Sequence, residues 1–354
     1  MTRGVLTNAG ERLGIDCDVD WIGALIVEAA DGGLTEGDPG NGTVLIRVEA
    51  TRDPFDTAGW EPVARGAHGH DRSLVLRNLL STGFDLRVEP DTDAGGAGGA
   101  VRFTFTFRWR PGRRERAMAL ALRSRFHLLA RSALLRYPAL WAAGTRAPSR
   151  APLHASACTA GVGGVALLAG PGGVGKSTLV AKELAAGGNA IGDNVCVSDG
   201  ASAWGVVEPL RVEGGTSAGL PWTALLRSPA RSAGGRRMQH GRREAHMPGR
   251  VASLAPDRLV VLRRGVSATA SVQPCSPEAG ARALVAGTYM AQELRRYWAF
   301  AATLALGTGI GPPHPPVAQV AGTLARDLPA TLIVLPNKPG PRLSELLEEA
   351  KTWT

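Results

Sequence analysis

The residues with the clearest chemistry form a glycine-rich segment near the middle of the chain. The segment consists of Gly170, Pro171, Gly172, Gly173, Val174, Gly175, Lys176, Ser177 and Thr178. It satisfies the pattern G-x-x-x-x-G-K-[ST] in full. Glycines let backbone N–H groups turn toward phosphate oxygens, and a following helix adds the positive end of its dipole. The pattern predicts a nucleoside triphosphate site in which Lys176 reaches the β- and γ-phosphates and Ser177 binds Mg²⁺.

Such a loop needs an apolar strand before it and a helix after it. Residues 165–169 form a short apolar run that is typical of a buried strand, and residues 177–186 are typical of a helix. Further central strands are expected at 259–262 and 331–335, and helices at 288–306 and 343–351. We therefore expect an α/β catalytic domain over residues 151–354.

Two further residues stand close to this motif in the sequence. His154 precedes the entering strand, and Asp193 lies 17 residues beyond Lys176, at the end of a second short run, 189–191. This interval suits one helix and one return strand beside the loop. Asp193 could also be a loop cap, and His154 a buried or capping histidine. Asn194 follows directly.

The arrangement resembles the catalytic domain of HPr kinase/phosphorylase and its related kinases. Members of that family carry a His-Gly element, a strand, the glycine-rich loop, a helix and an Asp-Asp pair at nearly this spacing. The resemblance covers residues 151–215 well and the rest of the domain loosely. It implies an HPr-kinase-like P-loop domain that phosphorylates a hydroxyl, and some relatives phosphorylate serine in peptides of natural-product pathways.

The resemblance also implies roles for single residues. His154 matches the family histidine, with Ala155 in place of the glycine, and Asp193 matches the first aspartate, which is linked to Mg²⁺ and to deprotonation of the acceptor. Asn194 stands where the family has its second aspartate. Asp193 would therefore serve as base, as metal ligand, or as both, and the reverse, phosphorolysis activity is disfavoured.

Several charged residues downstream are weaker candidates. Glu208 could be a second metal ligand and Arg211 a phosphate contact, although an ordinary surface turn fits them equally well. Arg242 and Arg243 lie in an arginine-rich stretch, where they could grip the transferred phosphate or an acidic acceptor. A solvated loop is the alternative.

The preceding residues, 1–145, predict a β-rich α+β domain with no recognised motif. Strands are expected at 24–27, 43–48, 84–88 and 101–109, the last with strict alternation of apolar and polar residues. A basic amphipathic helix is expected over 115–141, with its arginines solvated, followed by a linker at 144–152. This domain could dock a peptide, along a sheet edge for example, or could form a homo-oligomer.

Composition narrows the classes of protein. The net charge is +9 and the sequence pI about 10.1, which suits an acidic partner but also follows from an arginine-rich composition. The arginine-rich stretch has no interleaved aromatic residues, which argues against nucleic acid. No apolar run reaches the ~18 residues of a membrane span, so no membrane partner is expected. The four cysteines form no C-x-x-C pair, and a reducing cytoplasm is the simplest location.

Three functions are compatible with these features. The first is an ATP-dependent kinase acting on a hydroxyl, most readily serine, of a peptide or protein. The second is a kinase for a small molecule such as an amino acid or sugar. The third is a P-loop NTPase switch, which is disfavoured because no acid ends the strands at 259–262 and 332–335. GTP is the alternative nucleotide, but Asn337-Lys338-Pro339-Gly340 lacks the aspartate of a guanine-specific N-K-x-D motif.

Overall fold

The computed structural model describes most of the chain. The described residues are 1–79, 83–92, 100–109, 112–113, 126–161, 164–213, 236–237, 242–311, 314–337 and 340–351. The side chains of residues 212–213, 236–237, 242–245 and 350–351 fall outside this description. The part of the predicted basic helix up to residue 125 also lies outside it.

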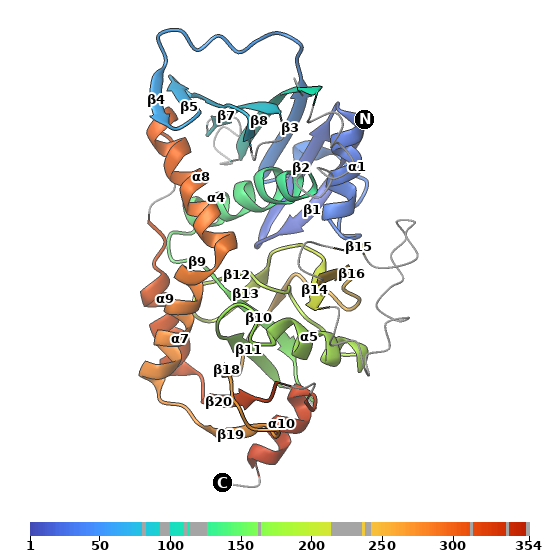
Figure 1. Cartoon of the computed structure of the whole chain (residues 1–354), viewed down its shortest axis with the longest axis vertical. Helices are drawn as coiled ribbons and strands as arrows, with labels where there is room; N and C mark the ends of the chain where they lie inside the picture. The colour runs from blue at the N-terminus through green and yellow to red at the C-terminus, as the bar shows by residue number, and fades with distance from the viewer. Residues whose placement is uncertain are drawn as a thin grey trace. The chain divides into compact units, whose positions relative to one another are not determined.

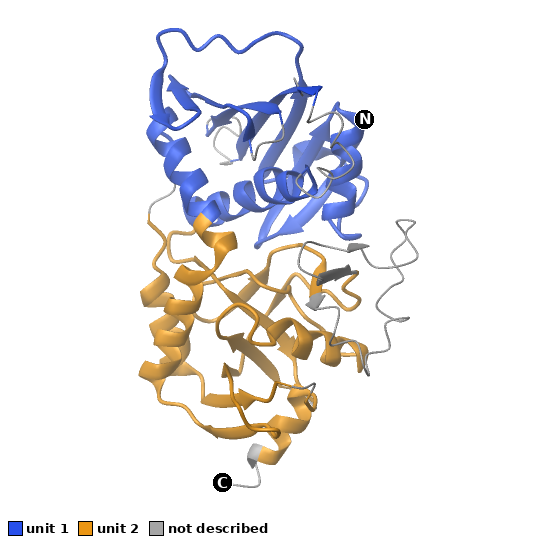
Figure 2. Cartoon of the chain, viewed as in Figure 1, with its two compact units in different colours: residues 1–146, 296–313 blue, residues 147–295, 314–354 orange. Residues whose placement is uncertain are grey.

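The chain divides into two compact units (Figure 2). Unit 1 contains Met1–Arg146 and Arg296–Pro313, and unit 2 contains Ala147–Arg295 and His314–Thr354. The sequence reading placed residues 296–313 in the second domain. The structure assigns them to unit 1, where the rings of Tyr297 and Phe300 lie 5.8 Å and 5.0 Å from that of Tyr137.

Unit 1 is built on an eight-stranded mixed sheet with the order β1-β2-β3-β8-β7-β6-β5-β4 (Figure 1). The β2–β3 and β3–β8 pairs are parallel and the other pairs are antiparallel. Its strands are β1 (Thr2–Asn8), β2 (Glu11–Cys17), β3 (Val44–Ala50), β4 (Glu61–Ala64), β5 (Ala67–His70), β6 (Ser73–Leu76), β7 (Phe84–Asp91) and β8 (Val101–Trp109). The predicted strands at 43–48, 84–88 and 101–109 are confirmed.

The alternation of apolar and polar side chains in β8 shows which face of this sheet is buried. Phe103, Phe105 and Phe107 are at most 2% exposed, and the ring of Trp141 packs edge-on against Phe103. Trp141 belongs to α4 (Tyr137–Arg146), which contacts β2 and β3. The phenylalanine face therefore forms the core of unit 1.

The predicted strand at 24–27 is wrong. These residues lie in the helix α1 (Asp20–Ala29), whose buried residues include Ile22, Leu25, Ile26 and Ala29. This spacing of three and four residues places the four side chains on one side of a helix. A four-residue apolar run read alone does not distinguish the two structures.

The basic helix is described only from Phe126 onward. It continues through the π-helical segment η4 (Ala130–Arg136) into α4, so the predicted linker at 144–152 is shortened to four residues before β9. Arg131 and Arg136 are only 1% and 2% exposed. The prediction of solvated arginines is therefore wrong for these two residues, which point into the unit.

The edge of this sheet that is formed by β1 is partly covered. Val5 of β1 exchanges two backbone hydrogen bonds with Thr35, at 2.8 Å and 3.0 Å. Thr35 precedes the short 3₁₀ helix η1 (Pro39–Asn41). This bridge interrupts the free edge along which an extended peptide could pair.

Unit 2 is centred on a five-stranded sheet with the order β10-β11-β18-β20-β19. The three middle strands are parallel and apolar, as expected for strands buried on both faces. The strands are β10 (Ala155–Thr159), β11 (Val165–Ala169), β18 (Arg258–Arg264), β19 (Ser271–Pro274) and β20 (Ala330–Leu335). The three strands predicted here are confirmed.

Helices cover both faces of this sheet (Figure 1). Leu168, Val260 and Leu262 pack with α5 (Lys176–Ala185) and α10 (Leu343–Lys351). Leu167, Leu259 and Val261, one residue earlier along the strands, pack with α7 (Pro277–Met290) and α9 (Val317–Asp327). Unit 2 is therefore a three-layer α/β structure, and the protein as a whole is mixed α/β.

Unit 2 also contains two smaller sheets. The sheets are β17 (Ser253–Leu254), β13 (Ala203–Gly205), β12 (Cys196–Ser198) and β9 (Ala151–Leu153), and β14 (Leu210–Glu213), β16 (Arg242–Ala245) and β15 (Arg236–Arg237). The helix predicted at 288–306 is two helices, because Ala291 is extended between α7 and α8 (Gln292–Thr308). The sequence reading also missed α9.

Among the residues that the structure describes, no helix is both long and apolar enough to cross a membrane.

Candidate functional site

The glycine-rich loop (residues 170–175) connects β11 to α5 at the carboxyl end of the parallel strands. Gly170, Gly173 and Gly175 have φ values of +150°, +79° and +117°, which favour glycine. A Cβ on Gly170 would lie 2.7 Å from the Leu262 carbonyl oxygen, so the loop packs directly on β18. Beside Gly172 and Gly173 a Cβ would meet nothing within 4 Å. The loop thus leaves open space of the kind that a phosphate cradle needs.

Lys176 is the first residue of α5 and is only 3% exposed. Its Nζ donates hydrogen bonds to the carbonyl oxygens of Gly170, at 2.7 Å, and Pro171, at 3.2 Å. Burial lowers the pKa of Lys176 to about 8, against the opposing effects of Asp193 and Glu293. The Lys176 ammonium therefore binds to carbonyl oxygens of the glycine-rich loop, next to the open space.

Asp193 is fully buried before β12. Its Oδ2 accepts hydrogen bonds from the backbone N–H of Arg211, at 2.9 Å, and from Asn194 Nδ2, at 3.2 Å. Its Oδ1 is buried and accepts no hydrogen bond from the described residues. Burial raises the pKa of Asp193 to about 6, while the nearby Ser177 hydroxyl acts to lower it. The structure thus brings together Ser177 and Asp193, which were predicted as metal ligands.

The backbone around Asp193 is held from two sides. The Ser156 hydroxyl of β10 donates a hydrogen bond to the Asp193 carbonyl oxygen. The preceding run, predicted as a strand at 189–191, forms only bridges of Ala190 with Cys158 and Arg250. These contacts position the carboxylate without a regular strand.

His154 lies between β9 and β10, where its backbone N–H donates to the Thr288 hydroxyl at 3.0 Å. Its ring is buried, and its Nδ1 makes no hydrogen bond with the described residues. Burial, together with the charge of Lys176, lowers the pKa of His154 to about 4. The ring is therefore neutral near pH 7.

Arg211 is held by two carboxylates rather than left free for a phosphate. Its guanidinium pairs with Glu208 at 2.5 Å and with Glu293 at 2.7 Å. Glu208 is fully buried, so it does not belong to a surface turn. Glu208 also accepts, through its backbone oxygen, a 2.7 Å bond from Arg250. These pairs argue for a positioning role of Glu208 and Arg211 and against Glu208 as a metal ligand.

A cavity of about 260 Å³ opens beside the loop. Several residues that were predicted for the site line this cavity, namely His154, Gly172, Gly173, Gly175, Lys176, Ser177, Thr178 and Arg211. Asn194 also reaches it, whereas Asp193 and Glu208 do not line it. The side chains of Arg242 and Arg243, in β16, lie outside the described residues.

The sequence reading missed two charged residues of this cavity. Arg264 ends β18, and its Nη1 donates to the Pro336 carbonyl oxygen at 2.6 Å. Its Nη2 lies 4.0 Å from where a Cβ of Gly175 would be, which places a positive charge beside the loop. Glu293 lines the cavity from the first turn of α8. Arg264 could have been predicted from the sequence, because it follows a run that was expected to form a central strand beside the strand before the glycine-rich loop.

The described residues contain no cluster of three or more histidine, cysteine, aspartate or glutamate side chains suited to a metal. At phosphate sites Mg²⁺ is commonly held through only one or two protein groups, with phosphate oxygens and water completing its coordination. Ser177 and Asp193 are the protein groups that fit. The open cradle, Lys176 and Arg264 fit the phosphates.

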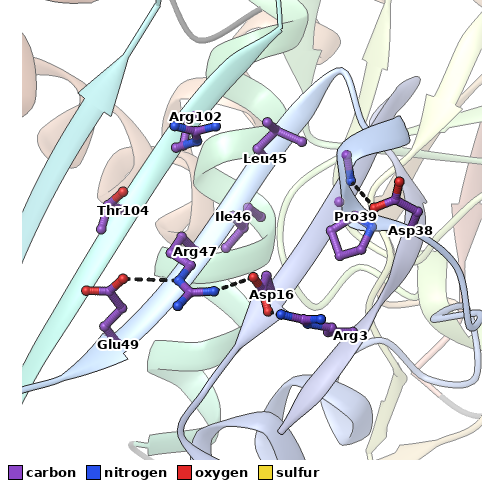
Figure 3. Close-up of a pocket in the computed structure, with 12 residues that line it drawn as sticks. Arg3, Asp16, Asp38, Pro39, Leu45, Ile46, Arg47, Glu49, Arg102 and Thr104 are labelled. Carbon is purple, nitrogen blue, oxygen red and sulfur yellow. Dashed lines mark hydrogen bonds and ion pairs between the residues drawn. The ribbon is translucent and has the colours of Figure 1, made fainter.

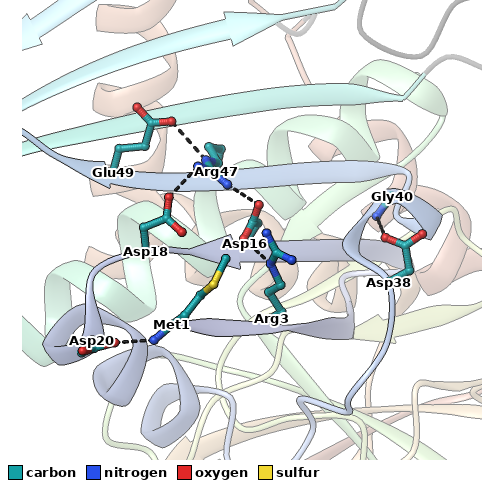
Figure 4. Close-up of polar contacts among 9 residues, drawn as sticks. All are labelled: Met1, Arg3, Asp16, Asp18, Asp20, Asp38, Gly40, Arg47 and Glu49. Carbon is teal, nitrogen blue, oxygen red and sulfur yellow. Dashed lines mark hydrogen bonds and ion pairs between the residues drawn. The ribbon is translucent and has the colours of Figure 1, made fainter.

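A larger cavity, about 540 Å³, lies on the outward face of the sheet in unit 1 (Figure 3). Its central residue is Arg47, which pairs with Asp16, Asp18 and Glu49 (Figure 4). Arg3 also pairs with Asp16, at 2.9 Å. Because these charges neutralise one another, the surface is explained as an ion-paired sheet face.

In comparisons with known proteins, no family model matches the chain, and no curated protein matches it.

Proposed function

We propose that this protein is an ATP-dependent kinase that transfers the γ-phosphoryl group to a hydroxyl, most readily a serine of a peptide or protein. One observation carries the proposal. Lys176, Ser177 and Arg264 face one cavity at the carboxyl end of a parallel sheet, with the buried Asp193 carboxylate beside Ser177. The carboxyl edge of such a sheet is where α/β proteins bind ligands.

The residues of the site have separate tasks in this reaction. The glycine-rich loop binds the phosphates through backbone N–H groups, and Lys176 and Arg264 neutralise their charge. Ser177 and Asp193 would hold Mg²⁺, which would supply positive charge to neutralise the phosphates. Exclusion of water and in-line alignment of the acceptor are then the main requirements.

The size of the cavity supports a hydroxyl on a short side chain as acceptor. A volume of about 260 Å³ is at the lower limit of small-molecule pockets. A space of this size is compatible with phosphate groups and a small acceptor group. A serine presented by a peptide meets this condition, and so does the hydroxyl of a small molecule.

The test incubates the purified protein with γ-labelled ATP, Mg²⁺ and a degenerate peptide library with a central serine, alongside the free amino acid. We expect label on serine peptides in the wild type and a loss of at least about 100-fold in Lys176→Ala and Asp193→Asn, because each removes charge from the transition state.

Lys182→Ala is the matched control, since this lysine lies on the same helix but bonds to the Gly340 backbone instead of the loop. Label on free serine alone would favour the small-molecule kinase. Release of free phosphate with no labelled acceptor would contradict the kinase and leave an NTPase switch.

A further inference from the structure

Among the side chains that the structure describes, three carboxylates lie around Arg211, and of these three only one lines the cavity. Asp193 accepts the Arg211 backbone N–H, and Glu208 and Glu293 pair with its guanidinium. Asp193 and Glu208 are 0% exposed, whereas the Glu293 side chain is 22% exposed and lines the cavity. The carboxylate that an incoming acceptor meets is therefore Glu293.

The position of Glu293 results from the break between α7 and α8. Ala291 is extended, so α8 starts a new direction and carries Glu293 in its first turn. Met290, Ala291 and Gln292 line the same cavity wall, and 66% of Met290 is exposed there. The charge of Glu293 acts on Lys176, where it partly offsets the lowering of the lysine pKa by burial. Glu293 thus shares one small space with the group expected to hold the γ-phosphate.

The other acid–base groups suit this task less well. Asp193 is 0% exposed and does not itself line the cavity; its Oδ2 already accepts hydrogen bonds from the Arg211 backbone N–H and from Asn194, and its carboxylate interacts with Ser177. His154 is neutral with a pKa of about 4 and is therefore a weak base. Asn194, which lines the cavity, has no basic group.

We propose that Glu293 is the catalytic base, which hydrogen-bonds the acceptor hydroxyl and accepts its proton, while Asp193 serves the Mg²⁺ side. The acceptor oxygen forms its bond to the γ-phosphorus as the bond to the β,γ-bridging oxygen breaks. The proton passes to the Glu293 carboxylate and from there to solvent, and the nucleoside diphosphate leaves. This inference rests on the proposed kinase function, and it assigns the carboxylate role to a residue 100 positions beyond Asp193 in the sequence.

The test uses Glu293→Gln, which keeps an oxygen to accept the Arg211 hydrogen bond, and Glu293→Ala, which removes the group. Glu278→Gln is the matched control, because Glu278 is an exposed acid in the first turn of the neighbouring helix α7. Serine-peptide phosphorylation, ATP hydrolysis by water and equilibrium binding of MgATP are measured for each variant. Formate is added to Glu293→Ala to supply a carboxylate in the vacated space.

We expect Glu293→Gln to lower the turnover of peptide phosphorylation by about 100-fold, in the range of a lost general base, with MgATP affinity within twofold of wild type. Formate is expected to restore at least tenfold to Glu293→Ala and nothing to Asp193→Asn. A structural role would not respond to formate.

Turnover of Glu293→Gln within a few-fold of wild type would overturn the inference, as would a parallel fall in MgATP affinity or no rescue by formate. If the wild type labels no peptide but hydrolyses ATP, the proposed acceptor class fails. The hydrolysis rates of the same variants then decide on Glu293 separately, because water enters the same space.

Discussion

Asp193 stores electrostatic strain in the folded protein. Its pKa is raised to about 6 by burial, from an ordinary value of 3.8. The folded state therefore binds more protons than the unfolded state between about pH 4 and 6. The stability conferred by the protonated form is lost as the pH rises through this window. Above it the charged carboxylate costs roughly 3 kcal/mol, at about 1.4 kcal/mol per pKa unit.

We predict that Asp193→Asn stabilises the protein at pH 7.5, by up to about 3 kcal/mol, although it removes activity. The asparagine oxygen can still accept the Arg211 backbone N–H. Urea unfolding of both proteins at pH 4 and pH 7.5 measures the effect, which should be large at pH 7.5 and near zero at pH 4. A destabilised variant at pH 7.5 would show that the carboxylate is needed for folding.

Arg264 and Arg263 are neighbours on β18 whose side chains alternate between the two faces of the sheet. Arg264 lines the cavity, and Arg263 does not. We predict that Arg264→Ala weakens MgATP binding about tenfold, as expected for loss of a charge-assisted contact of ~1.5 kcal/mol, while Arg263→Ala leaves it unchanged. Calorimetric titration with ATP and ADP measures both. Equal losses in the two variants would indicate a general charge effect.

At the scale of elements, the helices and strands that the sequence predicted correctly are those with a long or regular apolar pattern. The sequence predicted β8, β11, α5, β18 and β20 because each has a clear apolar period or run. Residues 24–27 failed because four apolar residues suit a strand and a helix alike. The sequence predicted one helix over 288–306 and not the break at Ala291, because neither glycine nor proline marks that position.

The same reasoning explains which parts of the site could be predicted. The loop residues, Lys176, Ser177 and Asp193 lie within one local motif, so their spacing in the sequence reflects their spacing in the structure. Glu293 and Arg264 reach the cavity from elements far along the chain, and only the sheet order brings them there. The sequence singled out Arg211 by its position, but its pairing with the buried Glu208 and the partly exposed Glu293 was not visible there.

At the scale of the whole molecule, the chain passes from unit 1 to unit 2, returns to unit 1 with most of α8, and passes back to unit 2. Within α8, Tyr297, Ala301 and Leu304 are at most 9% exposed. Gly69 of β5 approaches α8 so closely that a Cβ would lie 2.4 Å from Gly307. The segment 296–313 is thus a structural part of unit 1, although α8 starts in unit 2.

We predict that a protein starting at residue 147 does not behave as an independent domain. Removal of residues 1–146 would expose the apolar side of α8, which unit 1 covers, and exposed apolar patches cause association. Size-exclusion chromatography and thermal unfolding, with the full chain as reference, measure this. A monomeric fragment with an unchanged melting temperature would contradict it.

The discontinuity of unit 1 also has a consequence for protein synthesis. Domains usually fold as units while the chain emerges, the N-terminal one first. Here the N-terminal unit lacks its last helix until residue 313 has been made, by which time the glycine-rich loop, β18 and α7 already exist. Unit 1 therefore cannot be completed until most of unit 2 has been made, and unit 2 is itself completed only by residues 314–354, so the synthesis of the two units is interleaved.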